Sequence, residues 1–358
     1  MQGTLLHSTK YKKFIQDRDR ALEQVHLNTQ TDLSRILFEL LTQFEKEIAH
    51  LLLFLEPHRV ISLAQVLDQE SMQLFSQYVP KFVGRIRQMR RAVYLLSYLS
   101  EQEAIGRATQ KKKLQTSSDF LKKLNQAEEA QTVLNENLNN RIWVSLMKLR
   151  SRILDRFRSA LVSEDDPKEI FERVKQAFPN KIIYKRPPRE LKPIQESGKD
   201  PKDKLDYNYD FVPEEDWNLA VQAYKDAQLP PSRFDSEPHY DPDKGYLRYN
   251  WEIEQDLADD FVQQVRTGQV DAANELGIQE FVWVAIIDAK TDECCLQRHG
   301  KTTSEIESGL SSGKIDSSLC DAITPPAHPN CRCNLAPVAS VDEVEGPDWK
   351  SFNEWLET

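Results

Sequence analysis

Apolar residues recur at helical spacing through much of the first 180 residues. From Leu33 to Leu52 they follow the three, four, seven spacing that places side chains on one face of a helix. Thr31 or Asp32 is placed to cap the first turn of this helix, and Pro57 is placed to close it. The pattern therefore predicts a helix that begins near residue 32 and ends before residue 57.

Two further helices are predicted in the same part of the chain. One apolar stripe runs from Leu134 to Leu161, with most of its basic residues off the stripe. A shorter helix begins at Asp166-Pro167, because proline is favoured at the first helical position, and it continues to Phe178. Amphipathic helices of this kind need partners for their apolar faces, so we expect a bundle over residues 1–180.

Two changes of pattern follow. Residues 181–250 are rich in proline and acids and predict an extended connector lying over the surface. A helix is then predicted from Trp251 to Gly277, followed by a β-branched and aromatic strand from Phe281 to Ile287. The expected fold class is α+β: a helical region (1–180), the connector, a small C-terminal domain (251–335) and an acidic tail (336–358). In that tail Trp349, Phe352 and Trp355 would share one face of a short helix.

Composition excludes several classes of protein. Hydrophobic residues make up 39% of the 358 residues, and the net charge is −10, which rules out a uniformly basic nucleic-acid coat. The longest apolar run, Leu51 to Leu55, is far shorter than a membrane span, and no signal-peptide pattern opens the chain. Glycine-rich nucleotide-binding motifs and the hydrolase nucleophile motif are missing from the sequence. We expect no membrane partner.

Charge is unevenly distributed along the chain. Residues 81–125 carry eleven Lys and Arg against three acids, whereas residues 194–260 carry eighteen acids against seven bases. Lysine and arginine contact phosphate without reading base sequence, so the basic stretch is a candidate contact for DNA or for an acidic protein surface. A solvated helix face is the alternative. The candidate contact residues are Arg85, Arg87, Arg90, Arg91, Lys111, Lys112 and Lys113.

All five cysteines lie between Cys294 and Cys333, and two of the seven histidines lie among them. A metal site would use Cys295, His328, Cys331 and Cys333, because zinc favours four sulfur and nitrogen ligands. Its role would be structural. Cys294 and Cys320 are further thiols in the same block. Two alternatives stay open: the thiols pack as small apolar groups, or one pair forms a disulfide after release into oxidising surroundings.

A thiol enzyme is a third interpretation of the same block. Cys295 or Cys331 would be the nucleophile, His328 the base and Asp288 the carboxylate that orients the base. No pattern in the sequence marks an oxyanion hole, and adjacent thiols expose a nucleophile to oxidation. We therefore expect that the protein is not an enzyme.

The same block resembles a known family. Trp283 in a strand, Asp288-x-x-Thr291-x-x-x-Cys295-x-x-x-x-Gly300, and then Pro325-Pro-Ala-His-Pro-Asn-Cys-Arg-Cys333 are similar to the C-terminal signature of tailed-phage minor head proteins, the Mu-F-like head morphogenesis family. The specific match covers about Leu257 to Leu335, and the helical first half agrees only in being helical. Cys294, Cys320 and the acidic insert depart from the pattern.

The resemblance implies a structural function. Such a protein would be a minor capsid component of the virion, assembled in the host cytoplasm and located in the head interior or at the portal vertex. Its partners would be the portal protein and the major capsid protein during head assembly and DNA packaging or delivery, with packaged DNA reached through the basic helical stretch. The role of Asp288, Thr291 and Gly300 would be to turn the chain between the strand and the Cys/His loop.

Overall fold

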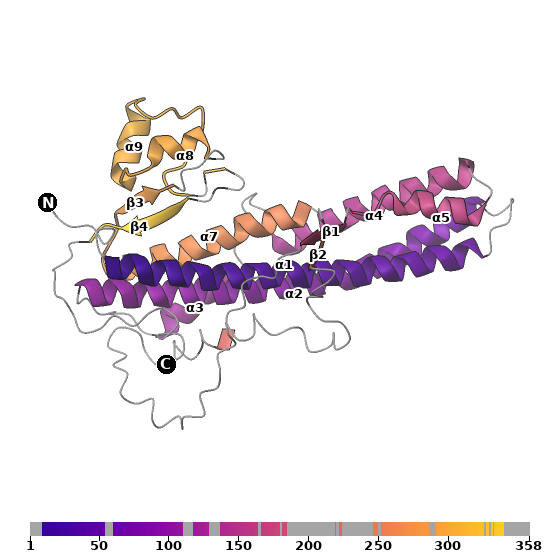
Figure 1. Cartoon of the computed structure of the whole chain (residues 1–358), viewed down its shortest axis with the longest axis horizontal. Coiled ribbons are helices and arrows are strands. Elements are labelled where there is room, and N and C mark those ends of the chain that lie inside the picture. The colour runs from indigo at the N-terminus through magenta and orange to yellow at the C-terminus, as the bar shows by residue number, and fades with distance from the viewer. Residues whose placement is uncertain are drawn as a thin grey trace, which may run out of the picture.

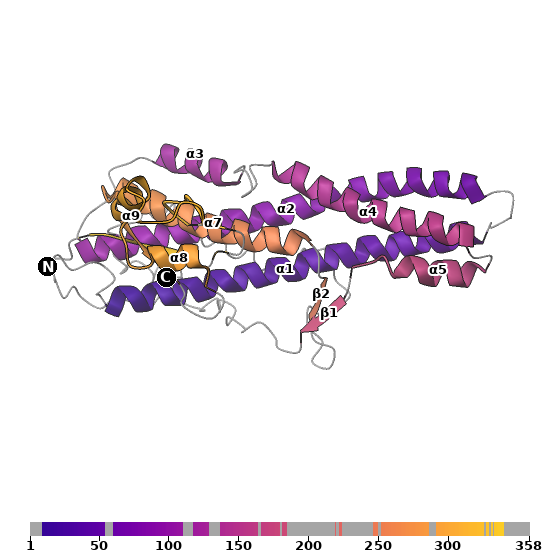
Figure 2. The same cartoon turned by 90° about the horizontal axis from the view of Figure 1, so that it is seen from above.

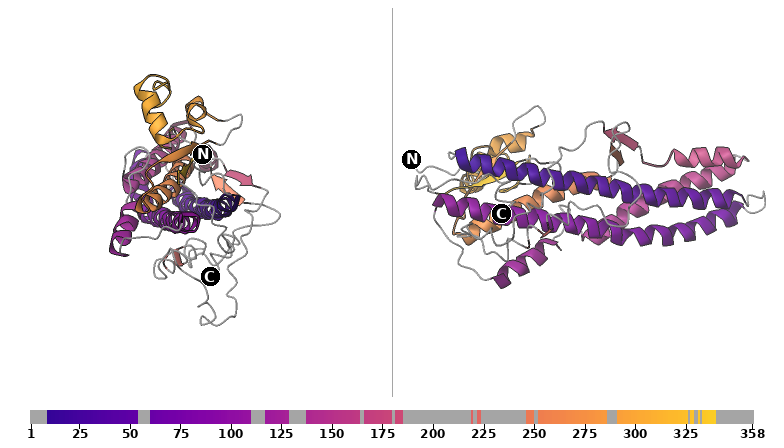
Figure 3. Two further views of the ribbon diagram at one scale, coloured as in Figure 1. Left: turned by 90° about the vertical axis from the view of Figure 1, so that its left-hand side faces the viewer. Right: turned by 60° about the horizontal axis from the view of Figure 1, so that its bottom comes forward.

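Two long helices form the axis of the molecule. In this computed structural model α1 (Thr9–Leu52) and α2 (Val60–Thr109) lie side by side and run in opposite directions (Figures 1 and 3). At 1.5 Å per residue their 44 and 50 residues extend for about 66 and 75 Å. The structure describes residues 9–53, 60–109, 117–128, 137–163, 166–179, 181–184, 219, 222–223, 246–249, 252–285, 291–325, 327–328, 331 and 333–339.

Helix α1 begins much earlier than the cap residues predict. Thr31 lies inside the helix and donates a hydrogen bond to the Leu27 carbonyl, at 2.9 Å. Asp32 is buried and pairs with Arg85 of α2 at 2.7 Å. The predicted start near residue 32 is therefore wrong. The physical reason is that the buried stripe continues upstream through Phe14, Leu22 and Val25, so packing against α2 extends the helix.

Both helices predicted after this pair are present, although the shorter one ends at Lys175 and not at Phe178. Helix α4 (Leu138–Ser163) buries the apolar stripe expected up to Leu161. Helix α5 (Pro167–Lys175) has proline in its first turn, and the Asp166 side chain accepts a hydrogen bond from the Lys168 amide at 2.9 Å. A short helix, α3 (Ser117–Glu128), also contacts α2. Helix α5 packs against α4, and α4 in turn packs against α2.

Helix α7 (Glu252–Glu275) packs against the helical region and leads into the C-terminal part of the chain. It lies along the second half of α2, while α4 lies along the first half (Figure 2). Arg90 of α2 pairs with Asp260 through nitrogen–oxygen distances of 2.8 and 2.7 Å, and both side chains are buried. The predicted C-terminal domain began at residue 251, but α7 shares its core with the helical region.

Glycine permits the close approach of α7 and α2. A Cβ atom built on Gly268 would lie 2.8 Å from the Tyr94 carbonyl oxygen, 2.9 Å from the Ser97 Cβ atom and 2.9 Å from the Tyr98 amide nitrogen. Two of these three atoms belong to the backbone of α2, which has no rotamer to change. Any larger residue at this position must push the helices apart.

Two small antiparallel pairs of strands complete the fold. Strand β1 (Lys181–Tyr184) pairs with β2 (Tyr246–Tyr249), so the ends of the predicted connector meet. Most of residues 185–245 lie outside the described residues, and the extended connector stays a prediction. Strand β3 (Phe281–Val284) pairs with β4 (Asn334–Pro337). The α+β fold class, with a helical N-terminal region, is confirmed.

A small unit follows α7 at one end of the long helices (Figure 1). Its helices α8 (Glu293–Arg298) and α9 (Thr303–Ser311) lie on the side of the β3–β4 pair that faces away from α1 and α2 (Figures 1 and 3). This unit has its own core around Trp283, Ile306 and Ile315, whereas Phe281 and Leu335 join the larger helical core. Within the described chain, every helix is too short or too polar to cross a membrane.

We predict that Gly268→Ala destabilises the protein by about 1–3 kcal/mol, because the added methyl group overpacks the contact between α7 and α2. The measurement is the free energy of unfolding in urea, monitored by circular dichroism. The matched control is Gly84→Ala in α2, where nothing lies within 4 Å of the added atom. We expect that control to be about 0.5–1 kcal/mol more stable than the wild type. Equal effects at the two glycines would contradict this packing.

Candidate metal centre

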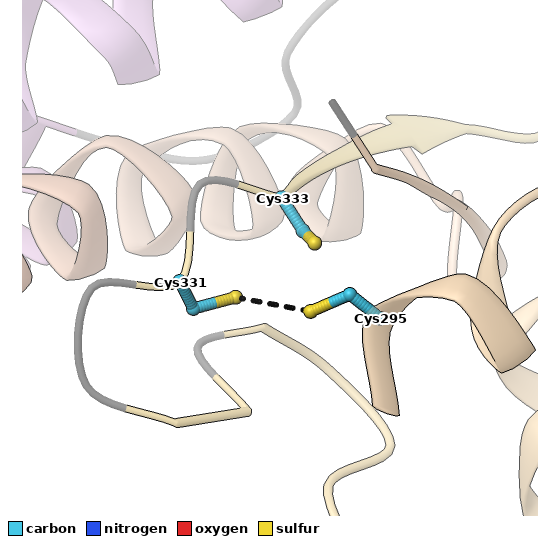
Figure 4. A group of neighbouring side chains, drawn as sticks. All are labelled: Cys295, Cys331 and Cys333. Carbon is cyan, nitrogen blue, oxygen red and sulfur yellow. Dashed lines mark hydrogen bonds between the residues drawn. The ribbon is translucent and has the colours of Figure 1, made fainter. Parts of the chain in front are cut away.

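Three buried thiols converge in the C-terminal unit. Cys295 comes from α8, whereas Cys331 and Cys333 directly precede β4. Figure 4 shows the three side chains pointing toward one another, and their Sγ atoms all lie within 4.8 Å of one another. The Sγ atoms of Cys295 and Cys331 are 3.8 Å apart. The exposed fractions are 2% for Cys295, 1% for Cys331 and 4% for Cys333, so the cluster is enclosed by protein.

Local structure fixes the direction of α8 and so of Cys295. Asp292 caps the helix by accepting a hydrogen bond from the Cys294 amide at 2.9 Å. Gly300 then reverses the chain at a φ of 76°, a conformation that favours glycine, and its amide donates to the Trp283 carbonyl at 2.8 Å. The helix is thereby held against β3. The predicted turning role of Gly300 agrees with this geometry.

His328 supplies an imidazole at the edge of the cluster. Its Nε2 atom lies 3.1 Å from the Cys295 Sγ atom, and the side chain is half-buried. Its carbonyl accepts a hydrogen bond from the Cys331 amide at 3.1 Å, which closes the loop onto the cluster. The structure therefore brings three of the predicted ligands, Cys295, Cys331 and Cys333, into one tight group, and the fourth, His328, lies beside Cys295.

Arg266 of α7 brings a positive charge to this cluster. Its Nη2 atom donates hydrogen bonds to the carbonyl oxygens of Cys331, at 3.3 Å, and of Cys333. Its Nε and Nη1 atoms are buried and find no hydrogen-bond partner among the described residues. Burial lowers the pKa of Arg266 to about 10, while the three thiols act in the opposite direction. The buried guanidinium is thus suited to an anionic cluster.

The thiols do not titrate alike. The hydrogen bond with Cys333 and then the charge of Arg266 hold the pKa of Cys331 at about 4, well below that of an ordinary thiol. The same hydrogen bond and burial raise the pKa of Cys333. Burial raises the pKa of Cys295 to about 11. The lowered pKa of Cys331 and the raised pKa of Cys333 together favour negative charge on Cys331 over Cys333.

The other two cysteines form a disulfide outside the cluster. Cys294 and Cys320 are bonded, with their Cα atoms 6.0 Å apart. The buried Arg298 donates to the carbonyls of Cys294, at 2.9 Å, of Cys320, at 2.7 Å, and of Ala322, at 2.9 Å. Of the alternatives left open by the sequence, a disulfide is therefore present for this pair, and the three remaining thiols can bind a metal ion.

The donor set fits zinc. Zinc favours four thiolate and imidazole ligands in a tetrahedral arrangement, with zinc–sulfur distances near 2.3 Å. Two sulfur atoms bound to one such ion would lie about 3.8 Å apart. The Cys295 and Cys331 sulfur atoms have this separation of 3.8 Å. Three thiolates and a neutral imidazole around Zn²⁺ leave one negative charge, which the guanidinium of Arg266 would balance.

The same geometry offers less to a thiol enzyme. Cys295 and His328 are within contact distance, as a nucleophile and base would be. However, Cys295 is only 2% exposed, and its raised pKa keeps it as a neutral thiol near pH 7. The lowered pKa of Cys331 favours a thiolate, but this residue is only 1% exposed. Asp288, the proposed orienting carboxylate, lies outside the described residues.

Two of the predicted DNA or portal contacts are buried inside the protein. Arg85 pairs with Asp32 of α1, and Arg90 pairs with Asp260 of α7. The two arginines are 4% and 0% exposed. The expectation that they face an external partner is corrected here, because their charges are used between helices. The acidic partners lie 53 and 170 residues away in the sequence, so the basic stretch alone could not reveal them.

The remaining predicted contacts are distributed differently. Arg91 is partly exposed and pairs with Glu128 at 2.6 Å, and Arg87 is half-buried. Lys111, Lys112 and Lys113 lie outside the described residues. Arg266 was not predicted as part of the centre, because only its position in the helix before the strand connects it with the motif.

Comparison of the chain with family models, with curated proteins and with solved structures finds no match.

We predict that alkylation in denaturant and chelator, without reductant, adds three labels to each chain. Cys295, Cys331 and Cys333 would be labelled, since Cys294 and Cys320 are bonded to each other. Mass spectrometry of the intact protein and of its peptides gives the count and the positions. Treatment with reductant first is the control and should raise the count to five. Five labels without reductant, or a single label, would contradict this division of the cysteines.

Proposed function

We propose that this protein is a structural minor head protein of a tailed phage. It would act at the portal vertex or in the head interior during head assembly and DNA packaging or delivery, without catalysing a reaction. The observation that carries the proposal is the convergence of the motif residues. Cys295, from the first half of the resembling signature, contacts His328 and Cys331 from the second half.

The centre would serve as a structural zinc site in this function. Cys295, His328, Cys331 and Cys333 would hold the ion. Bound zinc would cross-link α8 to the loop before β4 without taking part in redox chemistry. Such a link is valuable here because the second core consists of few residues around Trp283 and Ile306. Metal binding and folding of this unit would then be coupled.

The shape of the described part suits a component that connects other proteins. Helices α1 and α2 extend for about 66 and 75 Å and carry the C-terminal unit at one end (Figure 1). The burial of Cys295 and Cys331 supports a non-enzymatic role over a thiol-dependent enzyme that uses either residue with His328. The portal protein and the major capsid protein are the proposed partners, and packaged DNA is a further one.

Head assembly from this chain, a portal protein and a major capsid protein tests the proposal. We expect purified heads to contain this protein in low copy number, measured by quantitative mass spectrometry against the portal subunit. A Cys331→Ser chain should be incorporated less, because the C-terminal unit loses its central ligand. Gly84→Ala, on an open face of α2, is the control and should be incorporated normally.

Heads that contain a full complement of portal and none of this chain would overturn the proposed function. Normal incorporation of the Cys331→Ser chain would leave a head protein whose centre has no part in assembly, which contradicts the proposed role of the cluster.

A further inference from the structure

An open groove lies on helix α4, at a distance from the thiol cluster. Its volume is about 1030 Å³, and residues of α4 and of the segment just after α5 line it. Trp143, Val144 and Met147 give the groove an apolar part, and all three side chains are partly exposed. We call this feature the α4 groove. Partly exposed aromatic and aliphatic side chains in a concave surface are typical of a protein-binding site.

A row of positive charges borders the apolar part. Lys148, Arg152 and Arg156 line the α4 groove and are exposed, and their spacing of four residues places them along one side of the helix. Arg156 donates hydrogen bonds to the Arg173 carbonyl, at 3.3 Å, and to the Gln176 side-chain oxygen, at 2.8 Å. These two acceptors are neutral, so the positive charge of Arg156 is not offset by them.

One acid also lines the groove. Asp155 accepts a hydrogen bond from Arg158, at 3.3 Å, and Arg158 does not line the groove. The basic residues that line the groove outnumber this acid by three to one, so the lining has a net positive charge. The chemistry that fits this combination is an acidic helix with aromatic side chains on one face.

Residues 341–358 of the same sequence have that chemistry. They contain six acids and one lysine, and Trp349, Phe352 and Trp355 are spaced three residues apart. In a helix this spacing places the three aromatic rings on one side, next to acids such as Glu354. We propose that the α4 groove binds residues 341–358 of a second copy of this chain.

The distances within one molecule favour a second copy over the same chain. Strand β4 lies against α7 at one end of that helix, and α4 lies toward the other end (Figures 1 and 2). The 24 residues of α7 extend for about 36 Å. The ten steps from Ala339 to Trp349 span at most about 36 Å when fully extended, which is no more than the length of α7. Trp349 of the same molecule would need a fully extended connection even to reach the far end of α7, so a second copy is the favoured source of the segment.

Such a contact joins two different surfaces of identical chains. One copy supplies residues 341–358 and the next supplies the α4 groove, so the interface is head-to-tail and builds rings or open chains. The aromatic rings would supply the anchors, and Lys148, Arg152 and Arg156 would make association sensitive to salt. This inference does not depend on the proposed function.

The test is sedimentation velocity of full-length chains at several concentrations. We expect the wild type to self-associate. Arg152→Glu should self-associate at least about tenfold more weakly, because a negative charge in the groove would repel the acidic segment. A chain with Trp349→Ala and Trp355→Ala should also lose self-association, because residues 341–358 lose the aromatic rings that would enter the groove. Lys168→Glu, the same kind of charge reversal at an exposed position of α5 outside the groove, is the matched control and should associate like the wild type.

Mixing the two defective chains gives the sharpest result. The Arg152→Glu chain keeps residues 341–358 intact, and the Trp349→Ala, Trp355→Ala chain keeps the groove intact, so the mixture should form a one-to-one heterodimer. A wild type that stays monomeric, an Arg152→Glu chain that associates normally, or a mixture without heterodimer would each overturn the proposal. Loss of DNA binding in Arg152→Glu with unchanged self-association would assign the groove to nucleic acid instead.

Discussion

The contact between α7 and α2 is the constraint on which the rest of the structure depends. Gly268 lets the two backbones approach, and the buried pair of Arg90 and Asp260 fixes their alignment, since removing either charge would strand the other in the core. The same helix carries Arg266 to the carbonyls of Cys331 and Cys333. One helix thus joins the helical region to the thiol cluster, and a displacement of α7 would disturb both.

Local sequence patterns predicted those helices and strands whose apolar face can be recognised within a single segment of the chain. Helices α4, α5 and α7 and the start of β3 follow directly from apolar spacing and from Asp166-Pro167. The predicted start of α1 was wrong because Asp32 has the residue type of a helix cap. Its carboxylate instead pairs with Arg85, which lies 53 residues further along the chain. Helix propensity depends on residues that are neighbours in the sequence. The length of two packed helices depends instead on contacts between residues that are far apart in the sequence.

The candidate site was predictable in its ligands and unpredictable in its surroundings. His328, Cys331 and Cys333 are close in the sequence, and Cys295 belongs to the same motif. Adjacent residues on a helix point about 100° apart, so Cys294 and Cys295 cannot both face one cluster. That geometric argument separates Cys294 from the site, but nothing local identifies Cys320 as its partner or Arg266 as the neighbouring charge.

The central claim is that three thiols and His328 form a structural zinc centre held against α7. Metal analysis of the full-length chain, purified without chelator and combined with X-ray absorption at the zinc edge, tests it most directly. The account predicts one zinc ion per chain, sulfur-rich ligation near 2.3 Å, and loss of the ion in Cys331→Ser but not in a Cys294→Ser, Cys320→Ser chain. A metal-free wild type, or zinc retained at full occupancy in Cys331→Ser, would contradict it.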